Sequence, residues 1–335
     1  MAYTVDYASL SPEAVARRIK RERIRTLVKG MYDIQELRVA TGNRIVASMR
    51  PSLVDSVASR VSDEDKEAQD KAVQSALMQI AKEYDQITQY FVEQFKARGS
   101  VQKSIDAMSD QLDYIKSKID YEIVQSWGYL RASETTMLKS IEAEIKAYPL
   151  WDEFFAKVKG CGPLMAAVCI AYLDPYAART PSSFWKYAGL DVVRDEKGNM
   201  VGRRRWHTED REYVVDGEVK TKKSLTYNPF LKTKLVGVLG TSFLRARDSE
   251  YGKIYYDYKN RLDNRPPDAE GNTLRPAAKH RMATRYAVKM FLKDLWVAWR
   301  EFEDLPVVAP YSEVYLGREP HGAPRNQPLD KLDLQ

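Results

Sequence analysis

The sequence is poor in the residues that hold metal ions. Its 335 residues include two cysteines and three histidines. Cys161 and Cys169 stand in one expected helix, and the histidines His207, His280 and His321 are scattered along the chain. These residues cannot assemble a zinc-like cluster of the usual spacing. We therefore expect no metal and no other cofactor, and we interpret both cysteines as small buried residues.

Long apolar runs are also lacking. No segment reaches the roughly 18 apolar residues that a membrane-spanning helix needs. The N-terminal stretch of residues 1–18 does not show the charged and then apolar pattern of a secretion signal. We therefore expect a cytoplasmic protein without a membrane partner.

A strong net charge is missing as well, since the chain carries +6, but the charges are unevenly distributed. Residues 61–150 hold 11 basic and 16 acidic side chains, residues 194–234 hold 11 and 7, and residues 242–300 hold 13 and 7. Basic regions in a cytoplasmic protein favour a polyanionic partner, DNA or RNA. A solvated surface of mixed charge is the open alternative.

Helical patterns fill the first half of the chain. In the basic segment 1–60, Ser11 and Pro12 predict the start of one long helix, which Pro51 ends and which Gly30 or Gly42 could interrupt. The acidic segment 61–149 contains two apolar runs with coiled-coil spacing. They predict a helical hairpin, or arms that pair two copies into a homodimer, while an ordinary bundle remains open. The runs are Leu77, Ile80, Tyr84, Ile87 and Phe91, and then Ile105, Met108, Leu112, Ile115 and Ile119.

The segment 150–305 opens on a glycine motif, "VKGCGPLMAAVCIAYLDP", from Val158 to Pro175. A helix, a Gly-x-Gly turn and a second helix are typical of the helix-hairpin-helix motif. Gly160 would allow the tight turn, and Gly162 would let a phosphate approach the backbone at a helix N-terminus. A purely structural turn is the alternative.

Two β-hairpins are predicted after Val192, because turn residues at 197–199 and 216–217 separate strand-forming segments. Helices follow, one of them aromatic and basic at 245–265, and a flexible tail is expected at 306–335. The basic and aromatic residues of these segments, together with the glycine motif, form the predicted nucleic-acid site: Lys159, Gly160, Gly162, Arg203, Arg204, Arg205, Trp206, Lys220, Lys222, Lys223, Arg245, Arg247, Lys253, Lys259 and Arg261.

The order of these segments resembles the insertion-sequence-110 (116/110/902) family of transposases. The glycine motif is similar to the family's I-P-G-I-G-P-x-x-A-A entry, and "FWKYAGL" is similar to its A-A-Y-A-G-L segment. "NPFLKTKLVGVLGTSFLRAR" and "RMATRYAVKMFLKDLW" resemble its later helices, and "RTLVKGMYDIQELRVATGNRI" resembles the helix after its nuclease domain. The resemblance spans most of residues 15–300 and implies a coiled coil followed by a transposase domain with a helix-hairpin-helix.

Two departures bear on activity. The family's RNase H-like domain needs four clustered carboxylates for Mg²⁺, and before Glu13 only Asp6 is acidic, so the resemblance implies a chain that lacks this domain. The family's catalytic serine lies shortly after A-G-L, but no serine stands between Ser183 and Ser224. Ser224 would be the nucleophile only if the motifs are shifted.

The sequence thus predicts a mostly α protein with a small inserted β-hairpin region. Its predicted function is binding of DNA or structured RNA, mainly through backbone phosphates and without catalysis of its own. Two alternatives stay open: a serine-dependent recombinase that uses a partner nuclease, and a partner-binding protein without nucleic acid.

Overall fold

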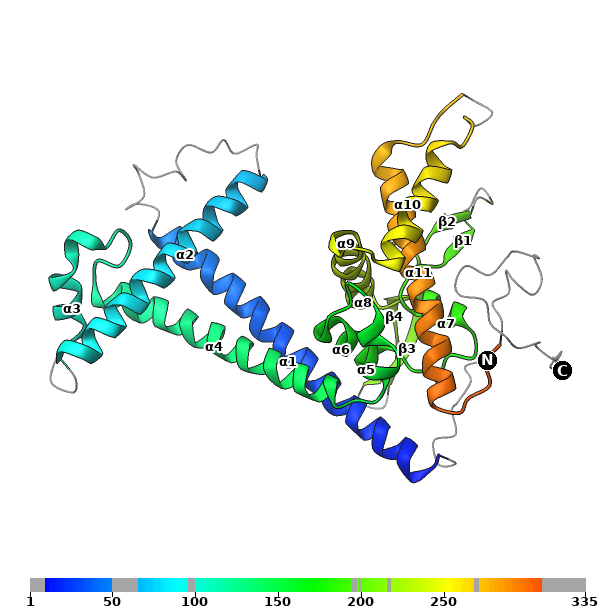
Figure 1. The fold of residues 1–335 in the computed structure, drawn as a ribbon, viewed down its shortest axis with the longest axis horizontal. Coiled ribbons are helices and arrows are strands. Elements are labelled where there is room, and N and C mark those ends of the chain that lie inside the picture. The colour runs from blue at the N-terminus through cyan, green and yellow to red at the C-terminus, as the bar shows by residue number, and fades with distance from the viewer. Residues whose placement is uncertain are drawn as a thin grey trace. The chain divides into compact units, whose positions relative to one another are not determined.

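The computed structural model describes residues 10–49, 66–95, 100–194, 198, 200–215, 218–267 and 271–308. Their fold is mostly helical, with two small antiparallel hairpins, as the sequence predicts (Figure 1). The longer helices are α1 (Pro12–Met49), α2 (Lys66–Tyr90), α4 (Lys118–Lys146), α6 (Pro163–Tyr172), α10 (Glu250–Asp263) and α11 (Pro276–Phe302). The shorter ones are α3 (Val101–Ala107), α5 (Leu150–Glu153), α7 (Pro181–Tyr187), α8 (Pro229–Thr233) and α9 (Gly240–Arg245). The strands are β1 (Val192–Arg194), β2 (Met200–Gly202), β3 (Thr208–Val215) and β4 (Glu218–Leu225).

The described residues form two compact units. The central unit comprises residues 29–140, and the terminal unit comprises residues 1–28 together with residues 141–335. Most of the tail predicted at 306–335 lies outside the described residues. The segment boundaries predicted near residues 60 and 149 stay a prediction.

Helix α1 is continuous, and neither of its glycines interrupts it. It begins behind Ser11, whose hydroxyl accepts a hydrogen bond from the amide of Ala14 at 3.2 Å, as expected for an N-cap. In the central unit, a Cβ added at Gly42 would lie 3.0 Å from Nε1 of Trp127, and one added at Gly30 would lie 3.0 Å from Cε of Met137. Both glycines therefore allow close packing of α1 on its neighbours.

The first heptad run packs inside this chain. Ile80 and Ile87 of α2 are completely buried in the core of the central unit, and Leu77 and Tyr84 are partly buried against it. Helix α1 contributes Ile45, Val46 and Met49 to the same core, and α4 contributes Tyr121, Val124 and Trp127. The most buried residues of the first heptad run thus pack against helices of the same chain.

The second heptad run is not a continuous helix, so a helical hairpin with a full second arm is the wrong description of residues 100–119. Helix α3 ends at Ala107, a 3₁₀ turn follows at Ser109–Gln111, and α4 begins only at Lys118. Ile105, Met108, Leu112 and Ile115 are still buried, as the apolar pattern predicts, whereas Ile119 is exposed. A compact loop, held by Glu83 of α2, brings them to the core.

In the terminal unit, α6 and α11 supply much of the buried surface. Helix α6 is buried from Met165 to Ala171 because its side chains are small and apolar. Trp296 and Trp299 of α11 are fully buried, and the indole of Trp296 donates a hydrogen bond to the carbonyl of Ala178 at 2.7 Å. Helix α11 also packs against α7, α9 and α10, so it positions the elements that carry the site.

Candidate nucleic-acid interface

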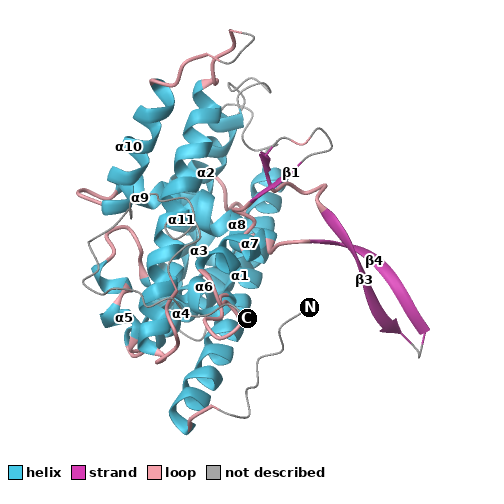
Figure 2. Ribbon diagram, turned by 90° about the vertical axis from the view of Figure 1, so that its right-hand side faces the viewer, coloured by secondary structure: helices cyan, strands magenta, loops and turns pink. Residues whose placement is uncertain are grey.

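The β3–β4 hairpin projects from the helices of the terminal unit (Figure 2). Its register pairs Thr208 with Leu225 at the root and Val215 with Glu218 at the tip. Every residue of β3 is exposed, as is every residue of β4 up to Lys223. Two bare strands bury no core of their own and are only marginally stable in isolation. The hairpin therefore presents its side chains outward.

One face of this hairpin is basic. Side chains alternate along a strand, and the register pairs Arg211 with Lys222 and Tyr213 with Lys220, so these four share one side. We call Arg211, Tyr213, Lys220 and Lys222 the basic hairpin face. The sequence had predicted only its two lysines.

The charges of the hairpin are only loosely compensated. On the basic side, Glu209 contacts Arg211 at 2.7 Å and Glu218 contacts Lys220 at 3.7 Å. Exposed ion pairs of this kind contribute little and exchange readily with another anion. Lys223 falls on the opposite side, together with Asp210 and Glu212. The basic hairpin face is thus the side suited to a polyanion.

Arg203 does not lie on this surface, although the sequence placed it among the phosphate contacts. It is 8% exposed, its Nε and Nη2 donate to the two carboxylate oxygens of Asp191 at 2.8 and 2.7 Å, and its Nη1 donates to Thr226. This bidentate pair ties the β2–β3 connection to the start of β1 and the end of β4. Arg203 therefore fixes the root of the hairpin.

Arg204, Arg205 and Trp206 do reach the surface. All three are exposed, Trp206 by 67%, and the guanidinium of Arg204 lies 4.9 Å from the centre of the Trp206 ring. His207 closes this turn, since its Nδ1 accepts a hydrogen bond from the amide of Arg204 at 2.7 Å. An exposed indole beside two arginines can stack on an unpaired base while the arginines face phosphate.

The glycine loop joins short elements. The segment before it is the single turn α5 and a 3₁₀ turn at Phe155–Lys157, and α6 follows, with Gly162 as its N-cap. Gly160 has φ +95°, and a Cβ there would lie 3.1 Å from the carbonyl oxygen of Ser242. Gly162 has φ −77°, and no atom lies within 4 Å of an added Cβ. Gly160 is therefore required by the fold, while Gly162 leaves open space at the N-terminus of α6.

The structure brings this loop to the junction of α9 and α10. Lys159 is exposed, and its carbonyl accepts a hydrogen bond at 3.2 Å from the hydroxyl of Ser249, the N-cap of α10. Three further predicted residues, Arg245, Arg247 and Lys253, are exposed and stand within eight positions of that serine. Lys159 and these three cations form a second basic group, separate along the chain from the hairpin.

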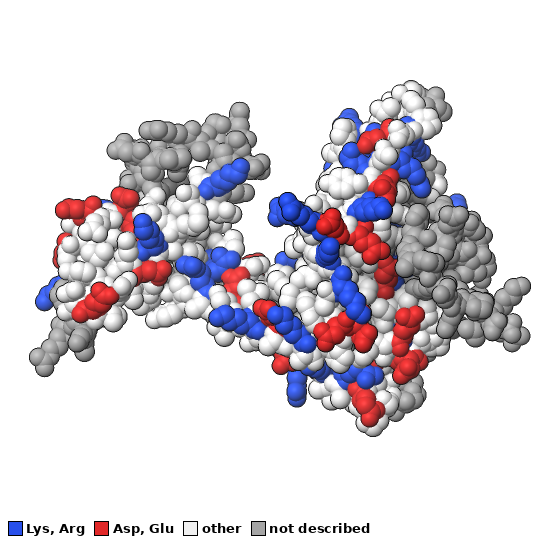
Figure 3. Space-filling model, viewed as in Figure 1, with Lys and Arg blue, Asp and Glu red and all other residues white. Residues whose placement is uncertain are grey.

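The last two predicted cations engage neighbours on their own helix. Lys259 contacts Asp263 at 2.8 Å, and Arg261 lies 5.2 Å from the ring of Tyr258. The hydrogen bond to Asp263 raises the pKa of Lys259. Figure 3 shows basic side chains gathered at this end of α10 and α11, with acidic ones among them. This end is therefore of mixed charge.

The two cysteines are buried, as predicted. Burial raises the pKa of the Cys161 thiol to about 12, and that of Cys169 lies well above the ordinary value for the same reason. Both thiols therefore stay protonated at neutral pH.

Ser224 lies in β4, half-buried and opposite Glu209. Among the residues that the structure describes, its hydroxyl has no hydrogen-bond partner. A serine nucleophile is normally activated by a base within hydrogen-bonding distance. The geometry thus gives no support to catalysis at this position.

Several cations outside the predicted site lie near the root of the hairpin. They are Lys232 of α8 together with Arg281, Arg285 and Lys289, which recur every four residues on α11 and so share one face of that helix. Burial and the neighbouring Arg285 lower the pKa of Lys232 to about 8. That four-residue spacing could have revealed the three cations of α11 from the sequence, but it gives no signal for Lys232.

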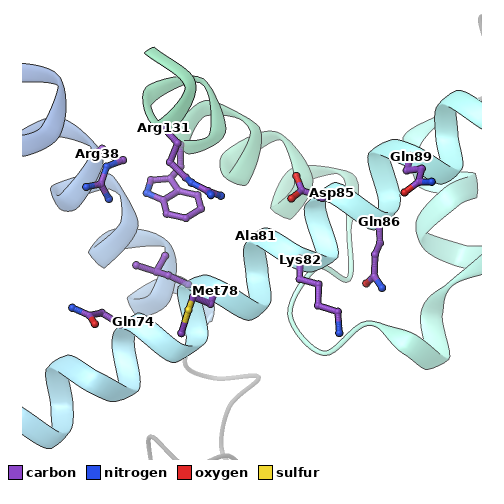
Figure 4. Close-up of a pocket in the computed structure, with 11 residues that line it drawn as sticks. Arg38, Gln74, Met78, Ala81, Lys82, Asp85, Gln86, Gln89 and Arg131 are labelled. Atoms are coloured by element: carbon purple, nitrogen blue, oxygen red, sulfur yellow. The ribbon is translucent and has the colours of Figure 1, made fainter. Parts of the chain in front are cut away.

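The central unit holds a separate groove of about 750 Å³ between α1, α2 and α4 (Figure 4). Its lining includes Arg38, Gln74, Met78, Lys82 and Arg131. Arg38 is engaged by Glu134, and the guanidinium of Arg131 lies 5.0 Å from the centre of the Trp127 ring. The groove is an open surface of mixed character without a convergent set of catalytic groups.

Within the described ranges, no three His, Cys, Asp or Glu side chains come together as a metal site would require. In the same part of the chain, no helix is both long enough and apolar enough to span a bilayer.

The role of Gly160 is tested by comparing alanine at the two glycines of the loop. Gly160→Ala is expected to lower the free energy of unfolding by about 1–3 kcal/mol, because its backbone is left-handed and the methyl group would meet Ser242. Gly162→Ala should change it by less than about 0.5 kcal/mol, as at an open site. Chemical denaturation of the two variants measures both values.

The same position reports on phosphate binding. Gly162→Asp places a negative charge at the N-terminus of α6 without a steric conflict. If the loop contacts phosphate, nucleic-acid affinity should fall for this variant, while its unfolding free energy should be no lower than that of Gly162→Ala because Asp is a favoured N-cap residue. Equal affinity for both variants would make the loop purely structural.

Comparison with known proteins connects this region to one family. Residues 152–214 match the model described as Transposase IS116/IS110/IS902 family. The match runs from α5 through the glycine loop, α7 and the Arg204–Trp206 turn to the end of β3. Neither the curated proteins nor the solved structures contain a significant match to the chain. Through residues 152–214 the chain is similar to the IS116/IS110/IS902 transposase family, which confirms the resemblance predicted from its sequence.

Proposed function

We propose that this transposase-derived protein binds DNA or structured RNA, chiefly through backbone phosphates, on the terminal unit. The single observation that carries the proposal is the exposed hairpin with its one basic face, which stands directly beside Arg204, Arg205 and Trp206. A β-ribbon of this width fits a nucleic-acid groove, and its cations would neutralise phosphates on either side. The family match supports the proposal, because transposases act on DNA.

The contacts divide by role. Arg211, Lys220 and Lys222 would contact phosphates, and such contacts fix position but carry no sequence information. Trp206 and Tyr213 are exposed by 67% and 43% and offer stacking surfaces to unpaired bases. Affinity would thus come mainly from charge, and a preference for unpaired or distorted strands would come from the two aromatic rings.

The proposal includes no chemistry at Ser224, because its hydroxyl meets no base among the described residues. It includes a homodimer and a cytoplasmic location. Since Ile80 and Ile87 are buried within one chain, a dimer contact would use other surfaces than the core of the heptad seam. Light scattering should then give twice the 38.5 kDa of the chain, and a monomer at micromolar concentration would remove this part alone.

The binding test neutralises the basic hairpin face. A triple variant, R211Q, K220Q and K222Q, is expected to bind about a hundredfold more weakly, which corresponds to about 1 kcal/mol for each lost contact. Its plot of log affinity against log salt should flatten by about 0.7–0.9 for each phosphate contact removed. Fluorescence anisotropy with duplex DNA, single-stranded DNA and a structured RNA gives both quantities.

A matched control removes the same charge elsewhere. Lys118, Lys139 and Lys146 are exposed on α4, so a K118Q, K139Q and K146Q variant should keep the parent affinity and salt slope. Identical salt slopes for the two triple variants would show that the hairpin is not the binding surface. Absence of binding to all three nucleic acids at low salt would sink the proposed function as a whole.

A further inference from the structure

Four cations converge behind the root of the hairpin. Lys232 comes from α8, Arg285 and Lys289 come from successive turns of α11, and Arg204 comes from the β2–β3 turn. The ammonium of Lys232 donates to the carbonyl of Arg203 at 2.7 Å. Arg285 lies against the end of β2, since a Cβ at Gly202 would fall 2.6 Å from its Nη1. Three elements therefore hold these side chains in one place.

Aromatic rings and backbone partly remove this cluster from water. The ammonium of Lys289 lies 4.3 Å from the centre of the Trp185 ring, and the Trp185 indole donates to the carbonyl of Lys289 at 2.9 Å. The ammonium of Lys232 lies 4.5 Å from the centre of the Tyr227 ring. Lys232, Arg285 and Lys289 are each half-buried. Cations held against aromatic faces keep their reach toward a ligand but lose part of their hydration.

The cluster lacks a matching number of carboxylates. Among the described residues, Asp191 is the one acidic group that acts on Lys232 and Lys289, and both of its oxygens already hold Arg203. Burial lowers the pKa of the Arg285 guanidinium, and repulsion by Arg204 and Arg281 lowers it further. Burial lowers the pKa of Lys289 as well. A bound anion would offset both the mutual repulsion and the lost hydration.

We propose that Lys232, Arg285 and Lys289 form a phosphate-binding pocket at the root of the β3–β4 hairpin. The inference rests on the proposed function in taking the phosphate of a nucleic-acid strand as its source. A strand that follows the basic hairpin face toward the root meets Arg204 and then these three cations. Guanidinium and ammonium groups in a partly dehydrated site bind phosphate more strongly than the exposed cations of the hairpin do.

Lys289→Met tests the pocket, with Lys146→Met as its matched control. Lys146 is exposed on α4, and its replacement by Met removes the same charge. For K289M we expect about tenfold weaker binding of a short oligonucleotide and a salt slope flatter by about 0.7–0.9. Because the substitution removes a charge whose burial is unfavourable, the Tm of free K289M should be equal to or higher than that of the parent chain. K146M should bind as the parent does.

A structural role for Lys289 predicts the reverse pattern, and that pattern would overturn the proposal: a lower Tm, with unchanged affinity and salt slope for the folded protein. Identical binding by K289M and K146M would overturn it too.

Inorganic pyrophosphate separates the two sources of phosphate. It should raise the Tm of the parent chain and raise that of K289M less, and it should compete with the oligonucleotide. If it protects the parent but not K289M, and no nucleic acid binds, the pocket stands as a site for a free phosphate compound and the proposed function fails. If it protects neither protein and the salt slopes agree, the pocket is refuted while binding by the hairpin can still hold.

Lys232 should make the nucleic-acid affinity depend on pH. Its pKa near 8 reflects burial and repulsion by Arg285, Arg203 and Arg204, against the attraction of Asp191. The protonated form binds phosphate, so parent affinity should fall as pH rises from 7 to 9. Lys232→Arg keeps its charge over this range and should flatten the profile. A profile that stays equally steep in this variant would remove Lys232 from the pocket.

Discussion

Replacing Arg203 with alanine is expected to lower the free energy of unfolding of the terminal unit by about 3 kcal/mol, the lower end of the range for breaking a buried ion pair. The loss comes chiefly from Asp191, whose two carboxylate oxygens would be left without their bidentate partner in a largely buried place. Thr226 would lose its contact as well. Chemical denaturation of the full chain measures the change.

Arg205→Ala is the matched control, because Arg205 is exposed two positions further along the chain. Its unfolding free energy should stay within about 0.5 kcal/mol of the parent value, while its nucleic-acid affinity falls. An Asp191→Ala and Arg203→Ala double variant should cost less than the sum of the two single changes, since neither charge is then left unpaired. Additive costs would show that the pair does not hold the hairpin root.

The adjacent arginines illustrate what the sequence could and could not reveal. The "GRRRW" stretch predicted three surface cations, and two of them are exposed. A run of like residues carries no signal of which member turns inward, because the partner of Arg203 stands 12 positions earlier and the two meet only when the β1–β2 hairpin closes. Charge density along the chain thus located the surface but not its individual contacts.

Local signals located most of the elements. Ser11 and Pro12 predicted the start of α1, and the turn residues separated both hairpins. The motifs from Val158 to Leu190 led to the family that residues 152–214 match. The cluster of Lys232, Arg285 and Lys289 escaped notice because it joins α8 to α11 across more than 50 residues.

Long-range contacts also explain the wrong heptad interpretation. Ile105, Met108, Leu112 and Ile115 repeat at 3 and 4, which is the spacing of a helix, and all four are buried. The backbone between Leu112 and Ser117 nevertheless leaves the helix. The spacing of apolar residues indicates which side chains face the core. It carries no information about a carboxylate 30 residues away that accepts hydrogen bonds from the backbone amides.

Glu83 is that carboxylate, and Glu83→Ala is expected to cost the central unit about 3–5 kcal/mol. The side chain is completely buried in the structure, and it accepts hydrogen bonds at 3.0 Å from the amides of Asp113, Tyr114 and Ile115. Hydrogen bonds to a charged acceptor contribute about 1.5–3 kcal/mol each, and a buried donor left without its partner adds about 1–3 kcal/mol, although the three losses are not additive.

Two comparisons isolate this role. Glu83→Gln keeps the shape of the side chain, but its amide offers one acceptor oxygen where the carboxylate offers two. The stability of this variant should therefore fall between that of the parent chain and that of Glu83→Ala. Asp85→Ala removes an exposed carboxylate from the same helix and should change stability by about 0.5 kcal/mol or less. Because the chain has two compact units, the central unit can unfold in a transition of its own. The stability change is taken from the shift of that transition in the denaturation curve. If Glu83→Ala unfolds at the same denaturant concentration as Asp85→Ala, the loop at 112–117 is held by its apolar side chains alone, and the account of why the heptad pattern fails there is wrong.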